Sequence, residues 1–265
     1  MPSLGLGDEK VARYVVQAPD SAIYQSVSEV ADAAGTSTAT VVRFAQKLGF
    51  KGFHELKLAL AQDLAAFERR PSARQDRRSV LERVTAAGAQ SVTDAAALVD
   101  PAAFEAAVAT LHSAKHLLWV GVGTSAPLAQ DAAYRFRTIG IHSEAPADVH
   151  IQHVAGRLLS PRDVCVSISH TGSTRETLAV VEAAKTAGAS TIAITSFLHS
   201  PLTDVADLVL TAGSREVSYR LEAMASRLAH MAVIDALLVA VAERDQKRSE
   251  RALDLYSSVL TEHRL

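Results

Sequence analysis

The spacing of apolar residues divides the chain into a purely helical first part and a later part in which strands alternate with helices. From about residue 8 to residue 66 the apolar positions recur every three or four residues, which predicts helices only. After Lys115, short apolar runs alternate with helical patterns. The predicted strands are 117–122, 141–145, 163–168, 191–195 and 208–211. Short strands joined by helices predict a parallel sheet covered on both faces.

Helical patterns also fill the rest of the second part. They cover 80–98, 101–112, 125–139, 150–159, 178–187, 218–242 and 249–260. A polar, arginine-rich segment with a proline, 67–79, separates the two parts and predicts a linker. We therefore expect an all-α domain over 1–66, a linker over 67–79, and a three-layer α/β domain with a doubly wound parallel sheet over 80–265.

Two short helices within the first part are joined by a glycine. Ser26 and Glu29 have the spacing of a capping box at the start of one helix. Gly35 is placed to end that helix in a left-handed conformation. Thr36 or Ser37 then caps the next one. Helix, short glycine turn and helix is the spacing of the helix-turn-helix, a motif that places its second helix in the major groove of DNA.

The second of these helices has a cationic face. Thr40, Arg43 and Lys47 fall on one side of it. Between residues 36 and 57, four cations stand against one carboxylate, a local charge of +3, whereas the whole chain carries −2. Such a face offers hydroxyl and cationic groups to bases and phosphates. An ordinary helical hairpin with a solvated face would show the same periodicity, so the pattern alone leaves both interpretations open.

A second candidate site is the turn that follows the predicted strand 163–168. Its residues Ser169 to Thr174 include four hydroxyl side chains and a glycine, and no acidic residue lies between Ser167 and Arg175. Because the turn leads into a helix, free backbone N–H groups and the positive end of the helix dipole meet there. This composition favours a phosphate site. The alternative is a polar turn whose hydroxyls merely cap the helix.

A glycine-rich loop follows the first strand and allows a different ligand. Residues 121–126 fit the dinucleotide pattern G-x-G-x-x-A, and Glu144 lies 21 positions after Gly123, where a ribose-binding acid would be. Hydroxyls at Thr124 and Ser125, and the richer loop at 169–174, argue against a dinucleotide. No H-E-x-x-H motif is present, and the chain has one cysteine. We therefore expect neither a metal nor a cofactor.

The helical part resembles the amino-terminal domain of RpiR-type bacterial transcription regulators. The resemblance lies in 38–44 (TATVVRF), 47–53 (KLGFKGF) and 55–57 (ELK). It implies a helix-turn-helix that binds operator DNA. The residues implied to contact DNA are Ser37, Thr38, Thr40, Arg43 and Lys47 in the recognition helix, with Lys51 as a phosphate contact.

The two loops together resemble the SIS (sugar isomerase) domain, whose pattern is G-x-G-x-S followed by S-x-S-G-x-T. Thr171 replaces the usual serine and keeps a hydroxyl. The resemblance implies a flavodoxin-like sheet and a phosphosugar effector. The candidate ligand residues are Gly123, Thr124, Ser125, Ser169, His170, Thr171, Gly172, Ser173, Thr174 and Glu222. Glu222 lies where SIS isomerases have an acid–base glutamate. It could contact sugar hydroxyls here, or be a surface acid near a helix start.

These patterns predict a transcriptional regulator that binds operator DNA and a phosphosugar and is not an enzyme. Paired operator half-sites predict a homodimer or tetramer. No apolar run approaches 18 residues and no secretory segment opens the chain, so we expect no membrane contact and a cytoplasmic location. An SIS-type sugar-phosphate isomerase and a nicotinamide-sensing repressor are the alternatives. The identity of the sugar, the operator and the direction of regulation are open.

Overall fold

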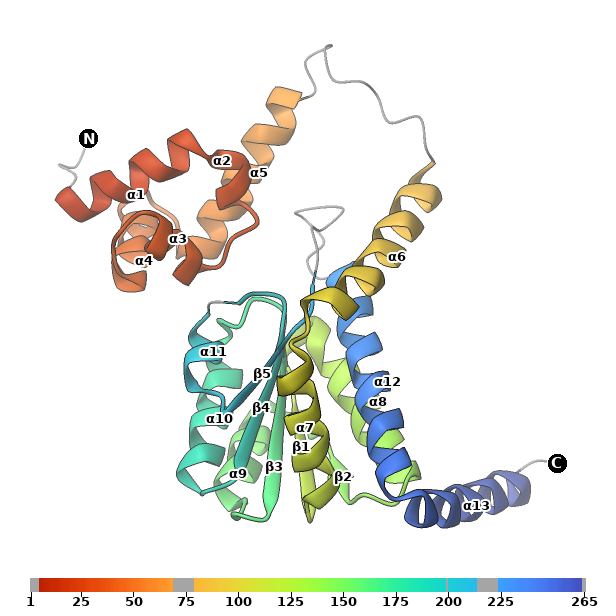
Figure 1. Cartoon of the computed structure of the whole chain (residues 1–265). Coiled ribbons are helices and arrows are strands. Elements are labelled where there is room, and N and C mark those ends of the chain that lie inside the picture. The colour runs from red at the N-terminus through yellow and green to blue at the C-terminus, as the bar shows by residue number, and fades with distance from the viewer. Residues whose placement is uncertain (1–4, 69–78, 199, 214–223, 264–265) are drawn as a thin grey trace.

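The structure, a computed structural model, describes residues 5–68, 79–198, 200–213 and 224–263. A helical domain stands above the upper end of an α/β domain (Figure 1). No helix in the described ranges is long and apolar enough to cross a membrane.

Within residues 5–68, five helices form the first domain around a small core. They are α1 Leu6–Gln17, α2 Pro19–Ala22, α3 Val27–Ala33, α4 Thr38–Lys47 and α5 Phe53–Glu68. The predicted capping box is present at α3, because the Ser26 hydroxyl accepts from the Glu29 N–H at 3.1 Å and the Glu29 carboxylate accepts from the Ser26 N–H at 2.7 Å. The Ser37 hydroxyl caps α4. Val11, Val30, Val41, Phe44 and Leu56 are among the residues buried between these helices. The helix-turn-helix is therefore α3 and α4.

In the described part of the second domain, five parallel strands lie in the order β2-β1-β3-β4-β5. Their bounds are β1 His116–Val120, β2 Ser143–Glu144, β3 Asp163–Ser169, β4 Ser190–Thr195 and β5 Leu208–Thr211. The accompanying helices are α6 Val80–Leu98, α7 Pro101–Ser113, α8 Ala126–Thr138, α9 Val149–Leu158, α10 Arg175–Thr186, α11 Pro201–Val205, α12 Ser226–Arg244 and α13 Gln246–Glu262. This is the predicted doubly wound α/β fold.

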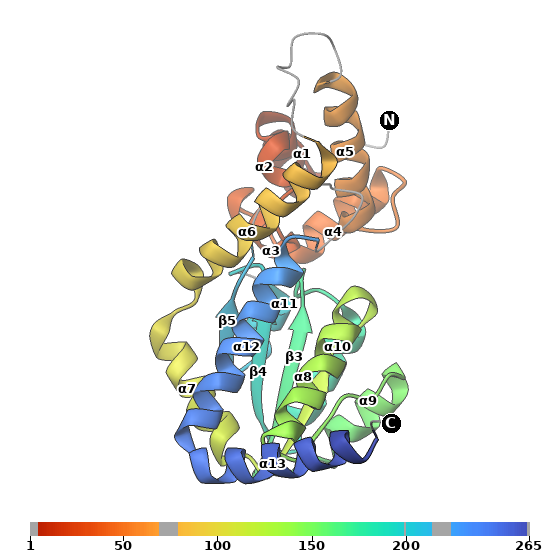
Figure 2. The ribbon, with the colours of Figure 1, turned by 90° about the vertical axis from the view of Figure 1, so that its right-hand side faces the viewer.

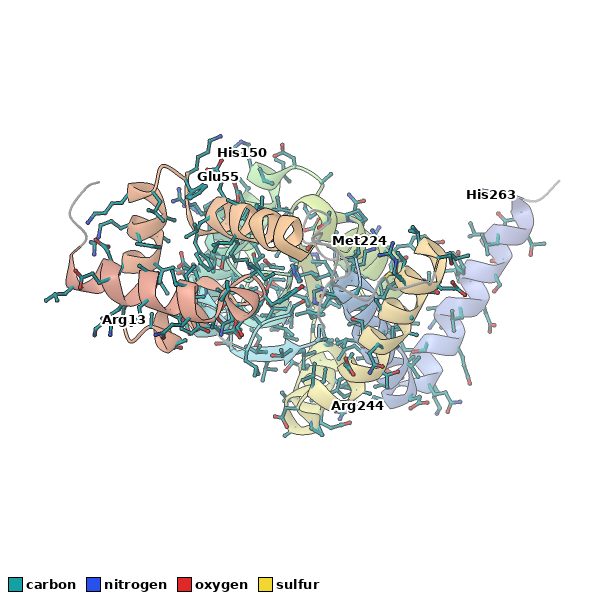
Figure 3. The ribbon with its side chains drawn as sticks, turned by 90° about the horizontal axis from the view of Figure 1, so that it is seen from above. Arg13, Glu55, His150, Met224, Arg244 and His263 are labelled. Atoms are coloured by element: carbon teal, nitrogen blue, oxygen red, sulfur yellow. The ribbon has the colours of Figure 1, made fainter. Side chains whose placement is uncertain are left out.

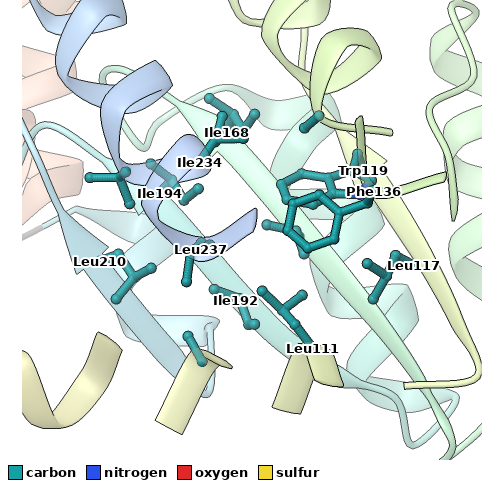
Figure 4. Close-up of a cluster of buried hydrophobic side chains, with 14 of the residues drawn as sticks. Leu111, Leu117, Trp119, Phe136, Ile168, Ile192, Ile194, Leu210, Ile234 and Leu237 are labelled. Carbon is teal, nitrogen blue, oxygen red and sulfur yellow. The ribbon is translucent and has the colours of Figure 1, made fainter. Parts of the chain in front are cut away.

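Alternate residues of each strand point to the two faces and form two separate cores. Leu117, Trp119 and Ile168 face α7, α8 and α12 (Figures 2 and 4). Leu118 and Cys165 face α9, α10 and α11. On the first face the rings of Trp119 and Phe136 lie 5.1 Å apart. Helices therefore cover both faces, and only the ends of the sheet are left for a ligand.

Most element bounds differ from the sequence-based prediction by one to three residues. The first strand ends at Val120, two residues early, because the backbone turns at Gly121. The last helix begins at Gln246, where Asp245 caps it by accepting from the Arg248 N–H at 3.1 Å. The helix predicted over 218–242 is described only from Ser226 onward, since residues 214–223 lie outside the described residues.

Candidate functional site

The strand order brings the two predicted ligand loops to one crevice. β1 and β3 are hydrogen-bonded neighbours, with Val120 opposite Ser167. The loop after β1 leads into α8 on one face of the sheet, and the loop after β3 leads into α10 on the other. Open α/β sheets bind ligands at such a switch point, outside the carboxyl ends of the strands. The adjacency needed for Ser125 and Ser169 to share a ligand is therefore present.

The first loop is a tight turn in which Ser125 is buried. Residues Gly123–Ser125 form one turn of 3₁₀ helix. A β-carbon at Gly121 would lie 2.8 Å from the Ser125 carbonyl oxygen, so only glycine fits there. The buried Gln152 of α9 donates from Nε2 to the Gly121 carbonyl at 3.1 Å. Gly123 and Thr124 are exposed at the tip of the loop.

The second loop is folded back on itself and fastened to α11. The Ser169 hydroxyl accepts from the Gly172 N–H at 3.2 Å and lies 3.4 Å from the Thr174 hydroxyl. Gly172 has φ of +61°, and a β-carbon there would lie 2.6 Å from that of Ser200. The Gly172 carbonyl accepts from the Leu202 N–H at 2.9 Å. A larger residue at position 172 would therefore push the loop away from α11.

The hydroxyls of this loop do not cap the helix that follows. Thr174 is the N-cap residue of α10, yet its side chain makes no capping hydrogen bond within the part of the chain described here. Ser26, Ser37 and Asp148 do cap their own helices. The first-turn amides of α10 thus have no side-chain acceptor of that kind. Exposed N–H groups at a helix start form a binding site for anions.

A chain of polar groups, partly buried at His170 and Ser196 and fully buried at His230, supports the loop from behind. His170 Nδ1 lies 2.8 Å from the Ser196 hydroxyl, which lies 3.1 Å from Nε2 of His230 on α12. Burial, and next the nearby ammonium of Lys57, lower the pKa of His170 to about 4. His170 is therefore neutral at pH 7. His170 was predicted from the sequence as a ligand residue, whereas Ser196 and His230 were not. Only the position of Ser196, directly after a strand, could have indicated it.

The loop opens into a cavity that both domains line. The cavity measures about 470 Å³. Thr171, Ser173 and Thr174 line one side, and the start of α3, α4, α5 and the turn between α4 and α5 line the other. Lys57 of α5 places its ammonium 5.6 Å from the ring centre of Phe197, which follows β4. Neither residue was singled out from the sequence, because no local pattern connects positions 140 residues apart.

The predicted DNA contacts divide into exposed and covered residues. Ser37, Thr38 and Arg43 are exposed on α4, and Lys51 is exposed in the turn that follows. Thr40 is only 8% exposed, because α1 packs on it. Its hydroxyl accepts from Arg43 Nη2 at 3.3 Å. Lys47 is exposed as well, so five of the six predicted residues lie on the surface.

Lys47, the sixth predicted contact, is tied to the neighbouring helix. Its ammonium forms an ion pair with the buried carboxylate of Asp8 on α1. The hydrogen bond from Lys47, and next that from the Gly5 N–H, lower the pKa of Asp8. Lys47 therefore also has a structural role in holding α1 against α4.

Two acids considered in the sequence analysis do not join the described site. Glu222 lies outside the described residues. Glu144 places its carboxylate 3.5 Å from His116, at the start of β1, whereas the glycine-rich loop is at the end of that strand. Within the described ranges no group of three or more histidine, cysteine or acidic residues could hold a metal ion.

Comparisons with known proteins identify both halves of the chain. Residues 3–67 match the family model "Helix-turn-helix domain, rpiR family", and residues 110–240 match "SIS domain". An uncharacterized HTH-type transcriptional regulator of Caldanaerobacter subterraneus is 34% identical over 96% of this chain and 92% of its own length. The HTH-type transcriptional regulator HexR of Pseudomonas aeruginosa is 33% identical over 92% of this chain and 87% of its own.

Solved structures show the same fold. The Vibrio vulnificus NanR protein complexed with ManNAc-6P superposes with a TM-score of 0.88 at 24% identity, covering 99% of this chain and 95% of that one. The sugar isomerase domain of an RpiR transcription factor from Sphaerobacter thermophilus gives a TM-score of 0.61 at 26% identity over 68% of this chain and 99% of its own. The likeness to NanR extends over both domains.

The lowered pKa of His170 predicts a specific acid sensitivity. Between about pH 6.5 and about pH 4 the unfolded chain binds a proton at His170 that the folded chain does not, so the free energy of unfolding falls as the pH is lowered through that window. Over this pH window we expect the free energy of unfolding of His170→Gln to fall by roughly 1–3 kcal/mol less than that of the wild type. Urea denaturation at several pH values measures it. His150→Gln, at an exposed histidine, is the control. The prediction would be contradicted if the free energy of unfolding changed equally with pH in the wild type and in His170→Gln.

Proposed function

We propose that this chain, which belongs to the RpiR family of helix-turn-helix transcriptional regulators with a SIS domain, binds a phosphosugar at the Ser169–Thr174 loop and changes its affinity for operator DNA in response. The observation that carries the proposal is the uncapped amino end of α10, surrounded by loop hydroxyls, at the β1/β3 switch point. The operator-binding role follows from the family. The ligand, its site and the switch are the parts proposed here.

The chemistry of the loop fits a phosphate better than a neutral ligand. Ser169, Thr171 and Thr174 supply hydroxyl donors, and the first turn of α10 supplies amides and a helix dipole. Ser125 lies at the start of α8, in the loop that follows β1, the strand next to β3. NanR, which has this fold over nearly the whole chain, was solved with ManNAc-6P, a phosphorylated sugar. That likeness supports the ligand class.

The helical domain is proposed to read DNA through the amino end of α4. In helix-turn-helix proteins the first residues of the recognition helix approach base edges, and here Ser37 and Thr38 are exposed at that end. Arg43 and Lys51 add positive charge. We propose a homodimer or tetramer, which matches two-fold operators. Exposed apolar side chains on α6 and α13, such as Leu81 and Leu255, are candidates for its contacts. Because the proposed partner is DNA, we also propose a cytoplasmic location.

A dinucleotide remains the second candidate ligand for the glycine-rich loop. The carboxylate of Glu144 would have to bind a ribose near Gly123, but it lies beside His116 at the opposite end of β1. The loop after β3 also offers a more complete anion site. Fluorescence titration with NADH separates the two ligands, because saturable binding of NADH would favour the dinucleotide.

We expect Ser169→Ala and Thr174→Val each to weaken binding of the phosphosugar by roughly tenfold or more. Removing a hydrogen-bond donor to a charged partner loses about 1.5–3 kcal/mol. A thermal-shift screen of sugar phosphates identifies the ligand, since saturation at about 100 times Kd adds about 2.7 kcal/mol of stability. Calorimetry then measures Kd. Thr186→Val, on the exposed far end of α10, is the matched control.

The same titrations test the switch. If the sugar changes operator affinity, operator DNA must change sugar affinity by the same factor. Equal sugar affinity with and without operator would reject the switch and leave the binding site intact.

We expect Arg43→Ala to weaken operator binding by about 1–3 kcal/mol and to relax preference at one base position. Lys51→Ala should weaken binding about equally for all DNA sequences. It should also reduce the slope of log K against log salt concentration by about one. Operators selected from random DNA, followed by gel-shift titration, provide the measurement. Lys115→Ala, exposed in the α/β domain, is the control. Unchanged affinity in the Arg43→Ala, Lys51→Ala double variant would rule out this face.

We also expect the SIS domain to sense its ligand without converting it. The relatives are named transcriptional regulators. Assays of aldose–ketose conversion on several pentose and hexose phosphates should therefore match the buffer blank. Robust conversion that disappears in Glu222→Gln would instead make this protein an isomerase.

A further inference from the structure

The cavity beside the phosphate loop belongs to both domains. On the α/β side its walls are Thr171, Ser173, Thr174, Arg175 and Phe197. On the other side they come from the start of α3, from α4 and α5, and from the turn between α4 and α5. Seen from above, the helical domain lies over this part of the sheet (Figure 3). A ligand held by the loop therefore faces the DNA-binding domain of its own chain.

Among the described residues, the charged side chains that line this cavity are all cationic. They are Lys51, Lys57 and Arg175, and no carboxylate from the described ranges joins them. Two of the three come from the helical domain. Arg175 is exposed, whereas Lys57 is partly buried. A charge that is partly removed from water interacts more strongly with a nearby anion than an exposed one does.

Lys57 is held in place by several contacts. Its ammonium donates to the Gln25 carbonyl at 2.9 Å and lies 5.7 Å from the ring centre of Phe53 and 5.6 Å from that of Phe197. Its charge also reaches the phosphate loop, because it contributes to the lowered pKa of His170. The ammonium is therefore positioned at the boundary between the two domains, on the side of the anion site.

We propose that the helical domain completes the effector site, with Lys57 supplying a cation to the phosphate that the Ser169–Thr174 loop holds. A phosphomonoester carries a charge of about −1.5 to −2 at pH 7. The hydroxyls and amides of the loop are neutral donors, so cations from outside the loop balance that charge. The bound phosphate then joins the two domains of one chain.

This arrangement gives the effector a direct route to the DNA-binding helix. A ligand shifts an equilibrium only through a difference in its affinity for the two states. Here that difference is the contact with Lys57, which exists only when the helical domain rests on the loop. The inference depends on the proposed phosphate site, and the test below separates the two.

The test uses the whole chain, with inorganic phosphate as the probe. Phosphate binding is measured from the rise in Tm in buffers of matched ionic strength. We expect Lys57→Gln to weaken phosphate binding by about tenfold or more, a change of about 1.4 kcal/mol per tenfold. Lys57→Arg should retain most of the binding, because the charge is kept. Lys247→Gln, exposed on α13, is the matched control. Circular dichroism verifies that each variant is folded.

A second measurement needs no variant. Acetylation of lysines in the wild-type protein, followed by mass spectrometry, should show that phosphate slows modification of Lys57 and leaves Lys247 unchanged. Phosphate binding that is lost in Ser169→Ala but unchanged in Lys57→Gln, with no protection of Lys57, would keep the phosphate site and overturn the role of the helical domain. Phosphate binding that is insensitive to Ser169→Ala would overturn both.

Discussion

The pairing of β1 with β3 is the contact on which the ligand site depends. Because these neighbours send their chains to opposite faces of the sheet, α8 and α10 diverge above them and leave a crevice. Gly121 and Gly172 let the two loops turn within that crevice, each at a point where a β-carbon would collide with its surroundings. The sheet thus sets where a ligand can bind, and the loops set its chemistry.

Features that depend on neighbours in the chain could be predicted from the sequence. The capping box at Ser26, the left-handed Gly35 and the hydroxyl-rich turn after β3 each involve residues within a few positions of one another. Strand positions followed from short apolar runs, which is why the sheet and its covering helices were expected correctly. The phosphate loop itself was visible because its polar residues directly follow a buried strand.

Features that depend on packing between distant elements could not be predicted in this way. Thr40 was expected on an open face, yet α1 covers it, and Lys47 pairs with Asp8, 39 positions away. The periodicity of α4 cannot show which neighbour lies on which face. His230 and Lys57 were missed for the same reason, because both reach the loop from helices whose own patterns give no sign of a ligand.

The charges around the cavity connect the two proposed activities. Lys51 lines the cavity, and it is also the exposed residue proposed to contact the DNA backbone. A phosphate in the cavity and a phosphate of DNA both lower the positive potential at this point, so each weakens the attraction for the other. Linkage makes that antagonism reciprocal. Of the two directions of regulation, the distribution of charge therefore favours release of the operator when the effector binds.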